Sequence, residues 1–92
     1  MKEENGNLIV QKTYSFALEI IALYRLLIEQ KEFVLSKQVL RAGTSIGANV
    51  HEAIASVSKK DFVNKLSISL KEARETSYWL NLLKDSKFIT EE

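Results

Sequence analysis

The sequence predicts an all-α protein, folded as an antiparallel up-down helical bundle in a single domain of residues 1–92. Two observations carry this prediction. The chain has no proline and only three glycines, although proline alone averages ~5% of residues, so few residues break helices. Apolar residues also recur at helical spacing, and turn signals divide the chain into three segments, about 8–30, 34–56 and 59–85.

Composition excludes several classes of function. The chain has no cysteine and one histidine, His51, which removes disulfides, thiolate metal sites and cysteine nucleophiles. The N-terminus is polar, unlike a signal peptide, and the most apolar stretch, residues 14–28, is shorter than the ~20 residues of a membrane span. We therefore expect a cytoplasmic protein that does not enter a membrane and needs no cofactor.

The first helix, residues 8–30, has an unusually wide apolar face. Apolar side chains between Tyr14 and Ile28 fill a continuous half circle of the helical wheel, whereas an ordinary surface helix has an apolar stripe of somewhat over ~100°. The helix is therefore expected to pack against more than one neighbour. Lys31 and Glu32 then mark a bend or a short loop.

The second helix, residues 34–56, contains two glycines. Ser36 is an alternative N-cap, which would move its start. Gly43 and Gly47 each cost ~1 kcal/mol relative to alanine and share one face, which predicts close approach of another helix there; a kink at Gly43 is the alternative. The small residues assigned to close packing are Gly43, Gly47, Ala48 and, on the third helix, Ala73.

The third helix, residues 59–85, begins with a recognisable cap. Ser58 is a good N-cap, and Asp61 occupies the position of a capping-box acid. A heptad-like seam with a small middle follows, formed by Phe62, Leu66, Ser69, Ala73, Thr76, Leu80 and Leu83.

The end of the sequence reads as the start of a further helix. Thr90, followed by Glu91 and Glu92, resembles an N-cap and an acidic first turn, and Phe88 and Ile89 would anchor it as a hydrophobic staple does. Either this tail frays, or a fourth helix is missing or truncated after residue 90.

Two opposite-charge pairs are expected between the second and third helices. If these helices pair around a turn at residues 57–58, Arg41 lies opposite Glu75 and Glu52 lies opposite Lys65. We expect at least one partly buried interhelical bridge, whose loss would be costly. The alternative is ordinary surface charge, where a pair contributes only ~0–1 kcal/mol.

Charge is unevenly distributed along the chain. The net charge is +1, but residues 33–89 hold nine basic and five acidic residues, a net charge of +4. Oligomerisation would multiply that charge into a phosphate-binding surface, whereas a solvated mixed surface is the alternative, and no recognition motif is present. The candidate nucleic-acid residues are Lys37, Arg41, Lys59, Lys60, Lys65, Lys71 and Arg74.

Catalysis has little support. Glu72 and Glu75 lie three residues apart, and paired acids can serve acid–base or metal chemistry. A di-metal carboxylate site in a bundle, however, also needs Glu-x-x-His pairs, and His51 has no such partner. We predict no enzyme and no catalytic, cofactor-binding or metal-binding residue.

The run from Leu35 to Ala53 (LSKQVLRAGTSIGANVHEA), followed by Ser58 to Leu80 (SKKDFVNKLSISLKEARETSYWL), resembles the four helix bundle protein family, also called the 23S rRNA intervening-sequence protein family. The resemblance implies an up-down four-helix bundle, assembly as a homopentamer and no enzymatic activity. A related branch comprises the basic accessory proteins of diversity-generating retroelements, which associate with reverse transcriptase and nucleic acid. This sequence departs from the family in its near-neutral charge and in ending where the fourth helix should begin.

Two functional hypotheses follow. The first is a non-catalytic, homo-oligomeric accessory factor associated with RNA or a ribonucleoprotein. The second is a protein-interaction scaffold that binds a partner helix and has no nucleic-acid role. Three helices alone would leave an apolar groove exposed, and such patches usually indicate a partner; a fourth helix or neighbouring chains would cover it.

Overall fold

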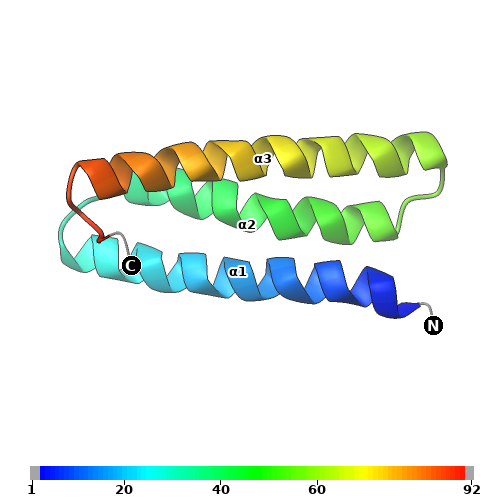
Figure 1. The fold of residues 1–92 in the computed structure, drawn as a ribbon, viewed down its shortest axis with the longest axis horizontal. Coiled ribbons are helices and arrows are strands. Elements are labelled where there is room, and N and C mark those ends of the chain that lie inside the picture. Colours follow the sequence, from blue (N-terminus) through cyan, green and yellow to red (C-terminus); the bar gives the residue numbers. More distant parts are fainter. Residues whose placement is uncertain (1–2, 91–92) are drawn as a thin grey trace.

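The computed structural model describes residues 3–90, with side chains from residue 8 onward, and shows three helices and no strand within those residues. The helices are α1 (Glu3–Glu29), α2 (Leu35–Ile54) and α3 (Lys59–Asp85), and the chain reverses direction at each of the two short loops (Figure 1). The prediction of an all-helical chain is thus confirmed. Helix α1 begins earlier than predicted, at Glu3 instead of near residue 8, because no proline in the polar segment stops the helix.

The loop between α1 and α2 is closed by backbone geometry that the sequence does not display. Lys31 adopts a left-handed conformation with φ 66°, and the Glu32 N–H donates to the Leu27 carbonyl at 2.9 Å, a typical helix C-terminal closure. The Glu32 carboxylate then accepts hydrogen bonds from the Leu35 and Ser36 N–H groups at 3.0 and 2.6 Å. The alternative N-cap at Ser36 is therefore wrong, because Glu32 satisfies these donors.

The loop between α2 and α3 follows the prediction. Ser58 is the N-cap of α3, and its hydroxyl oxygen accepts a hydrogen bond from the Asp61 N–H at 3.0 Å. This bond satisfies one of the N–H groups that a helix N-terminus leaves without an intrahelical partner.

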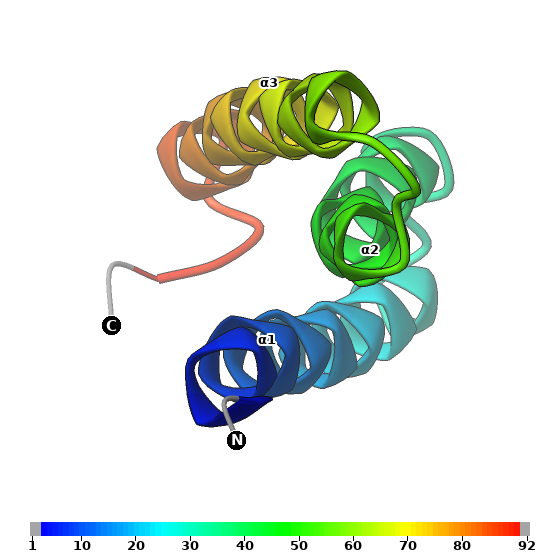
Figure 2. The same cartoon turned by 90° about the vertical axis from the view of Figure 1, so that its right-hand side faces the viewer.

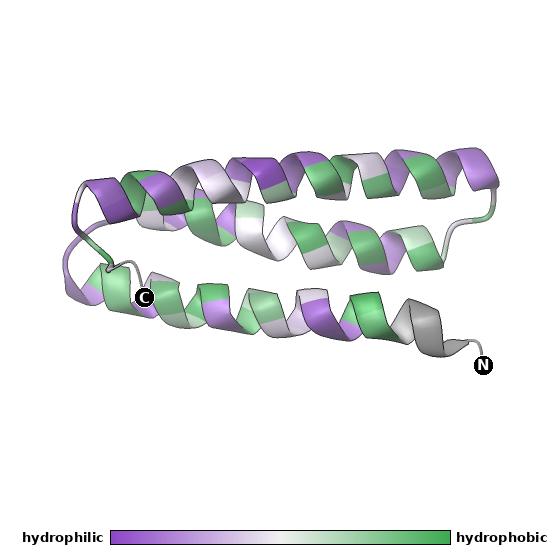
Figure 3. Cartoon of the chain, viewed as in Figure 1, coloured by the Kyte–Doolittle hydropathy of each residue, from purple (hydrophilic) through white to green (hydrophobic). Residues whose placement is uncertain are grey.

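Helix α2 is the central element. It packs against both α1 and α3, while the Cα atoms of α1 stay more than 8 Å from those of α3 within residues 3–90, and Figure 2 shows α2 linking the other two helices. Apolar residues recur along α1 from Leu8 onward (Figure 3). Several of its large side chains stay exposed, in agreement with the wide apolar face that the sequence indicates: Leu8, Ile9, Tyr14, Leu18 and Leu26.

The core lies towards the end of the molecule that holds the α1–α2 loop, which we call the closed end. The buried cluster consists of Ile20, Leu27, Val39 and Leu83. After α3, Lys87 takes φ 73°, the Phe88 N–H donates to the Leu83 carbonyl at 2.9 Å, and the chain bends towards α1 (Figure 2). Phe88 and Ile89 then pack against the buried cluster.

This arrangement revises the interpretation of the chain end. Phe88 and Ile89 cover the core instead of leading into a helix within the described residues, and Thr90 is not helical. Glu91 and Glu92, on which the predicted start of a fourth helix also depends, lie outside the described residues.

The two glycines of α2 face α1. A Cβ added to Gly43 would lie 2.7 Å from Cγ1 of Ile20, and one added to Gly47 would lie 3.2 Å from the Thr13 carbonyl oxygen. Both glycines lie within the unbroken helix α2, so close approach of α1 compensates for their low helix propensity.

Candidate functional site

Three charged side chains join α2 to α3 at mid-length. The Arg41 guanidinium donates to Glu72 Oε1 at 3.3 Å and also bonds Glu75 Oε2, to which Trp79 Nε1 donates at 3.1 Å. The Glu72 side chain is only 13% exposed, so its charge needs this partner. The structure thus brings the predicted pair Arg41 and Glu75 together and adds Glu72.

The second predicted pair also forms, nearer the α2–α3 loop. Lys65 Nζ lies 2.9 Å from Glu52 Oε1. The hydrogen bond to the Glu52 carboxylate and its charge raise the pKa of Lys65 above its ordinary value, because both favour the charged ammonium. This pair is more solvated than the Arg41 cluster, since the Glu52 side chain is 59% exposed.

These ion pairs give Glu72 and Glu75 a structural role. The Arg41 guanidinium pairs with both carboxylates. It therefore occupies the position that a metal ion would take between two carboxylates. No cluster of histidine, cysteine or acidic residues that would hold a metal ion occurs in the part of the chain that the structure describes.

The other two residues assigned to close packing lie elsewhere. Ala48 is exposed, because it is turned about 100° along the helix from Gly47, which touches α1. The close-packing prediction is therefore wrong for Ala48, whereas Ala73 is half-buried and lines a groove among the three helices, so its close-packing role stays a prediction. The close approach of α3 to α2 is instead made by Ser69, whose hydroxyl donates to the Ile46 carbonyl at 2.9 Å.

An apolar groove lies at the opposite end of the molecule, which we call the open end because it holds the α2–α3 loop and, among residues 8–90, no buried apolar cluster. This open-end groove has a volume of about 370 Å³ and receives side chains from all three helices. Four of its lining residues, Phe62, Leu66, Ser69 and Ala73, belong to the apolar seam predicted for the third helix. Its lining consists of Ile9, Thr13, Ile46, Val50, Ile54, Phe62, Leu66, Ser69, Leu70 and Ala73.

A second hollow lies where α1 and α2 meet. It has a volume of about 420 Å³ and includes Tyr14, Ala17, Gly47, Ala48 and His51. Tyr14 is 66% exposed. Helix α1 therefore presents apolar side chains both to the open-end groove and to this second hollow.

The seven candidate nucleic-acid residues do not form one patch. Arg41 and Lys65 are held in ion pairs with acids between α2 and α3. Lys37 is exposed on α2, and Lys59 is the first residue of α3. The other three, Lys60, Lys71 and Arg74, are exposed on α3 and form no ion pair with residues 8–90.

Two acids of α3 and three of its bases lie on different sides of the helix. Glu72 and Glu75 turn towards Arg41 of α2. Lys60, Lys71 and Arg74 lie at intervals of 11 and 3 residues, which places them on one line at 3.6 residues per turn. This spacing is visible in the sequence, but it does not emerge when all basic residues between positions 33 and 89 are counted together.

These features define a class: an all-helical protein with an apolar groove uncovered by the described helices and a basic line on its third helix. The model of the 23S rRNA-intervening sequence protein family matches residues 6–92. The chain therefore belongs to that family, as its α2 and α3 motifs predict.

A solved structure supports the fold. The chain is 55% identical to a Bacteroides thetaiotaomicron protein of unknown function from the S23 ribosomal protein family, whose crystal structure it matches with a TM-score of 0.92. The match covers 94% of this chain and 78% of that one. No curated protein matches the chain. None of the three helices described has the length and apolar character that crossing a membrane requires.

Proposed function

We propose that the protein is a non-catalytic, homo-oligomeric accessory factor that associates with RNA or a ribonucleoprotein. The open-end groove is the observation that carries the assembly part of the proposal, and family membership supports the RNA part. The proposal includes a cytoplasmic location and no membrane partner.

The groove supports assembly because it gathers apolar side chains that the described helices leave exposed. Leu70 is 63% exposed and Ile54 is 51% exposed, although both line the groove. Contiguous apolar surface of this kind is rare on monomers and marks contact sites. A fourth helix laid along the groove completes an antiparallel four-helix bundle, and the second hollow, with Tyr14, then contacts a further copy.

Light scattering on the purified protein tests the assembly. We expect a homopentamer at micromolar concentration, as the family resemblance implies, and therefore a mass five times that of the 10.5 kDa chain. A monomer across the micromolar range would contradict this part of the proposal.

An RNA titration at two salt concentrations tests the other part. Binding through phosphates weakens as salt rises, because bound cations displace counterions from the nucleic acid. We expect measurable affinity at low salt that falls steeply at high salt. Absence of binding at low salt would rule out an electrostatic RNA role.

The second candidate is a protein-interaction scaffold without nucleic-acid contacts. The open-end groove favours it directly, since an amphipathic partner helix fits a groove lined by three helices. A stable assembly that binds no RNA at low salt would favour this candidate over the first.

A further inference from the structure

The outer side of α3 carries a continuous line of hydrogen-bond donors. Its members recur at 4-3-4-3-4 spacing, which keeps them on one face over about five helical turns. All six residues are exposed. We call this line the outer strip, and it consists of Lys60, Asn64, Ser67, Lys71, Arg74 and Tyr78.

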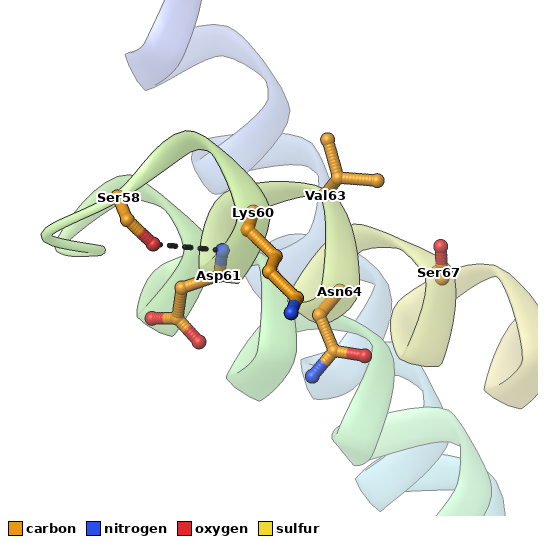
Figure 4. A pocket seen from close by; sticks show the side chains of 6 residues that line it. All are labelled: Ser58, Lys60, Asp61, Val63, Asn64 and Ser67. Atoms are coloured by element: carbon orange, nitrogen blue, oxygen red, sulfur yellow. Dashed lines mark hydrogen bonds between the residues drawn. The ribbon is translucent and has the colours of Figure 1, made fainter.

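The N-terminal half of the strip borders a shallow hollow. Figure 4 shows Lys60 and Asn64 on consecutive turns, with Ser67 one turn further along the helix. Asp61 also lines this hollow and directly follows Lys60 in the chain. Its backbone N–H bonds the Ser58 hydroxyl as part of the helix cap.

The strip keeps its positive charge because two acids of α3 are held away from it, while Asp85, which is also exposed, lies beyond Tyr78 at the C-terminal end of the same line. Glu72 and Glu75 are bound to Arg41 on the α2 side. Lys60, Lys71 and Arg74, in contrast, form no ion pair within residues 8–90. Three unneutralised cations on one helical line attract a polyanion.

The strip is also independent of whatever fills the open-end groove. The groove side of α3 is formed by Phe62, Leu66, Leu70 and Ala73, and the α2 side by Ser69 and Thr76, which are buried. On the helical wheel the strip lies on the opposite side from these residues except Leu70, which borders it. Assembly through the groove therefore leaves it accessible.

We propose that the outer strip binds the phosphate backbone of single-stranded RNA; this inference rests on the proposed RNA association and assigns it a site. Asn64 and Ser67 add neutral donors between the cations, as phosphate and sugar contacts require. Tyr78, 58% exposed and held edge-on against Trp79 with ring centroids 5.2 Å apart, offers a ring face for an unpaired base. The aromatic ring favours RNA over an acidic peptide.

The test measures binding of a labelled mixed-sequence single-stranded RNA of about 20 nucleotides to the full chain. The strip variant Lys60→Gln/Lys71→Gln/Arg74→Gln removes three charges while preserving helix propensity. The matched control Lys12→Gln/Arg25→Gln/Lys31→Gln removes three exposed charges from α1 and its loop. Both variants should keep the melting temperature of the native chain, because all six side chains are exposed.

We expect the strip variant to bind at least tenfold more weakly than the native chain, and the control within about twofold. The slope of log affinity against log salt should fall by about 2 in the strip variant, since each lost single-strand phosphate contact contributes ~0.7. Tyr78→Ala should weaken binding about fivefold or more and leave the slope unchanged, because stacking releases no counterions.

Three results would overturn the inference. If the control loses as much affinity as the strip variant, RNA binding stands but the outer strip is not its site. If poly-glutamate binds as tightly as RNA, the strip recognises acidic protein instead. If the native chain binds no RNA at low salt, the proposed function itself fails, and the site with it.

Discussion

The closed and open ends of the molecule use the same three helices but differ in how far they bury their apolar residues. At the closed end, Leu27, Val39 and Leu83 are completely buried, because Phe88 and Ile89 fold back across the cluster. At the open end, Leu70 and Ile54 stay more than half exposed. Helical pairing through α2 alone therefore does not bury a core; a further segment must cover the side opposite α2.

The comparison also separates two kinds of apolar residue. Those of the closed end stabilise the single chain, whereas the exposed residues of the open-end groove, such as Leu70 and Ile54, do so only once something covers them. Val50, which also lines the groove, is already buried. The same division applies to the ion pairs, because the Arg41 cluster includes a largely buried carboxylate, while the Lys65 pair nearer the open end is solvated.

The largest expected effect comes from deleting a leucine side chain at each end. Leu83→Ala should lower the free energy of unfolding by about 2–5 kcal/mol, because it leaves a cavity in the buried cluster. Leu70→Ala should change it by less than about 0.5 kcal/mol, since that side chain is 63% exposed in the single chain. Urea unfolding of both variants measures the difference.

Protein concentration sharpens this test. In dilute solution the two variants should differ as stated, and at concentrations where copies associate, the cost of Leu70→Ala should rise. If Leu70→Ala costs as much stability as Leu83→Ala even in dilute solution, the open-end groove is covered within one chain. The contrast between the two ends would then be wrong.

The second effect concerns the Arg41 cluster. Arg41→Met keeps the aliphatic stem but leaves Glu72 and Glu75 close together without a cation, so we expect a loss of about 1–2 kcal/mol of stability. Arg74→Met is the matched control, because Arg74 is exposed and forms no ion pair with residues 8–90. Thermal melting of the two variants is the measurement; equal melting temperatures would show that the cluster is only surface charge.

Local rules account for what the sequence predicts correctly. The three helical segments and the Ser58 cap depend on residues that are near in sequence. The two interhelical charge pairs depend on a simple register between adjacent helices. The glycine face is another such case, since Gly43 and Gly47 share one side of α2 and meet Ile20 and Thr13 of α1. The prediction fails at Ala48 because the residue next to a contact on a helix points elsewhere.

Features that need the assembled backbone are beyond sequence reasoning. Glu32 caps α2 only because Lys31 adopts a left-handed conformation, which lysine seldom does. Phe88 and Ile89 likewise reach the core only because Lys87 also adopts a left-handed conformation and turns the chain. The site is a mixed case, because the line of Lys60, Lys71 and Arg74 is present in the sequence, whereas the engagement of Glu72 and Glu75 on the other side of α3 depends on Arg41.

A smaller effect tests whether the closed end buries a polar group without a hydrogen-bond partner. The Ser36 hydroxyl is completely buried and has no hydrogen-bond partner, and burying such a group carries a desolvation penalty. Ser36→Ala should therefore leave stability unchanged or raise it by up to about 1 kcal/mol. Differential scanning calorimetry measures the change, and a clear loss of stability would show that the hydroxyl is bonded in solution.

The smallest effect lies nearer the open end, in the pair of Lys65 with Glu52. The pKa of Lys65 is raised in the folded chain by its bond to Glu52, so the pair stabilises the fold while Lys65 is charged and ceases to do so as the pH rises through that raised pKa. We expect Lys65→Met to melt slightly below the native chain from pH 6 to 9. The gap should begin to narrow above the ordinary value of 10.5 and close once the pH exceeds the raised pKa. A gap that persists in alkali would mean that the lysine stem, packed against its neighbours, stabilises the fold more than its charge does.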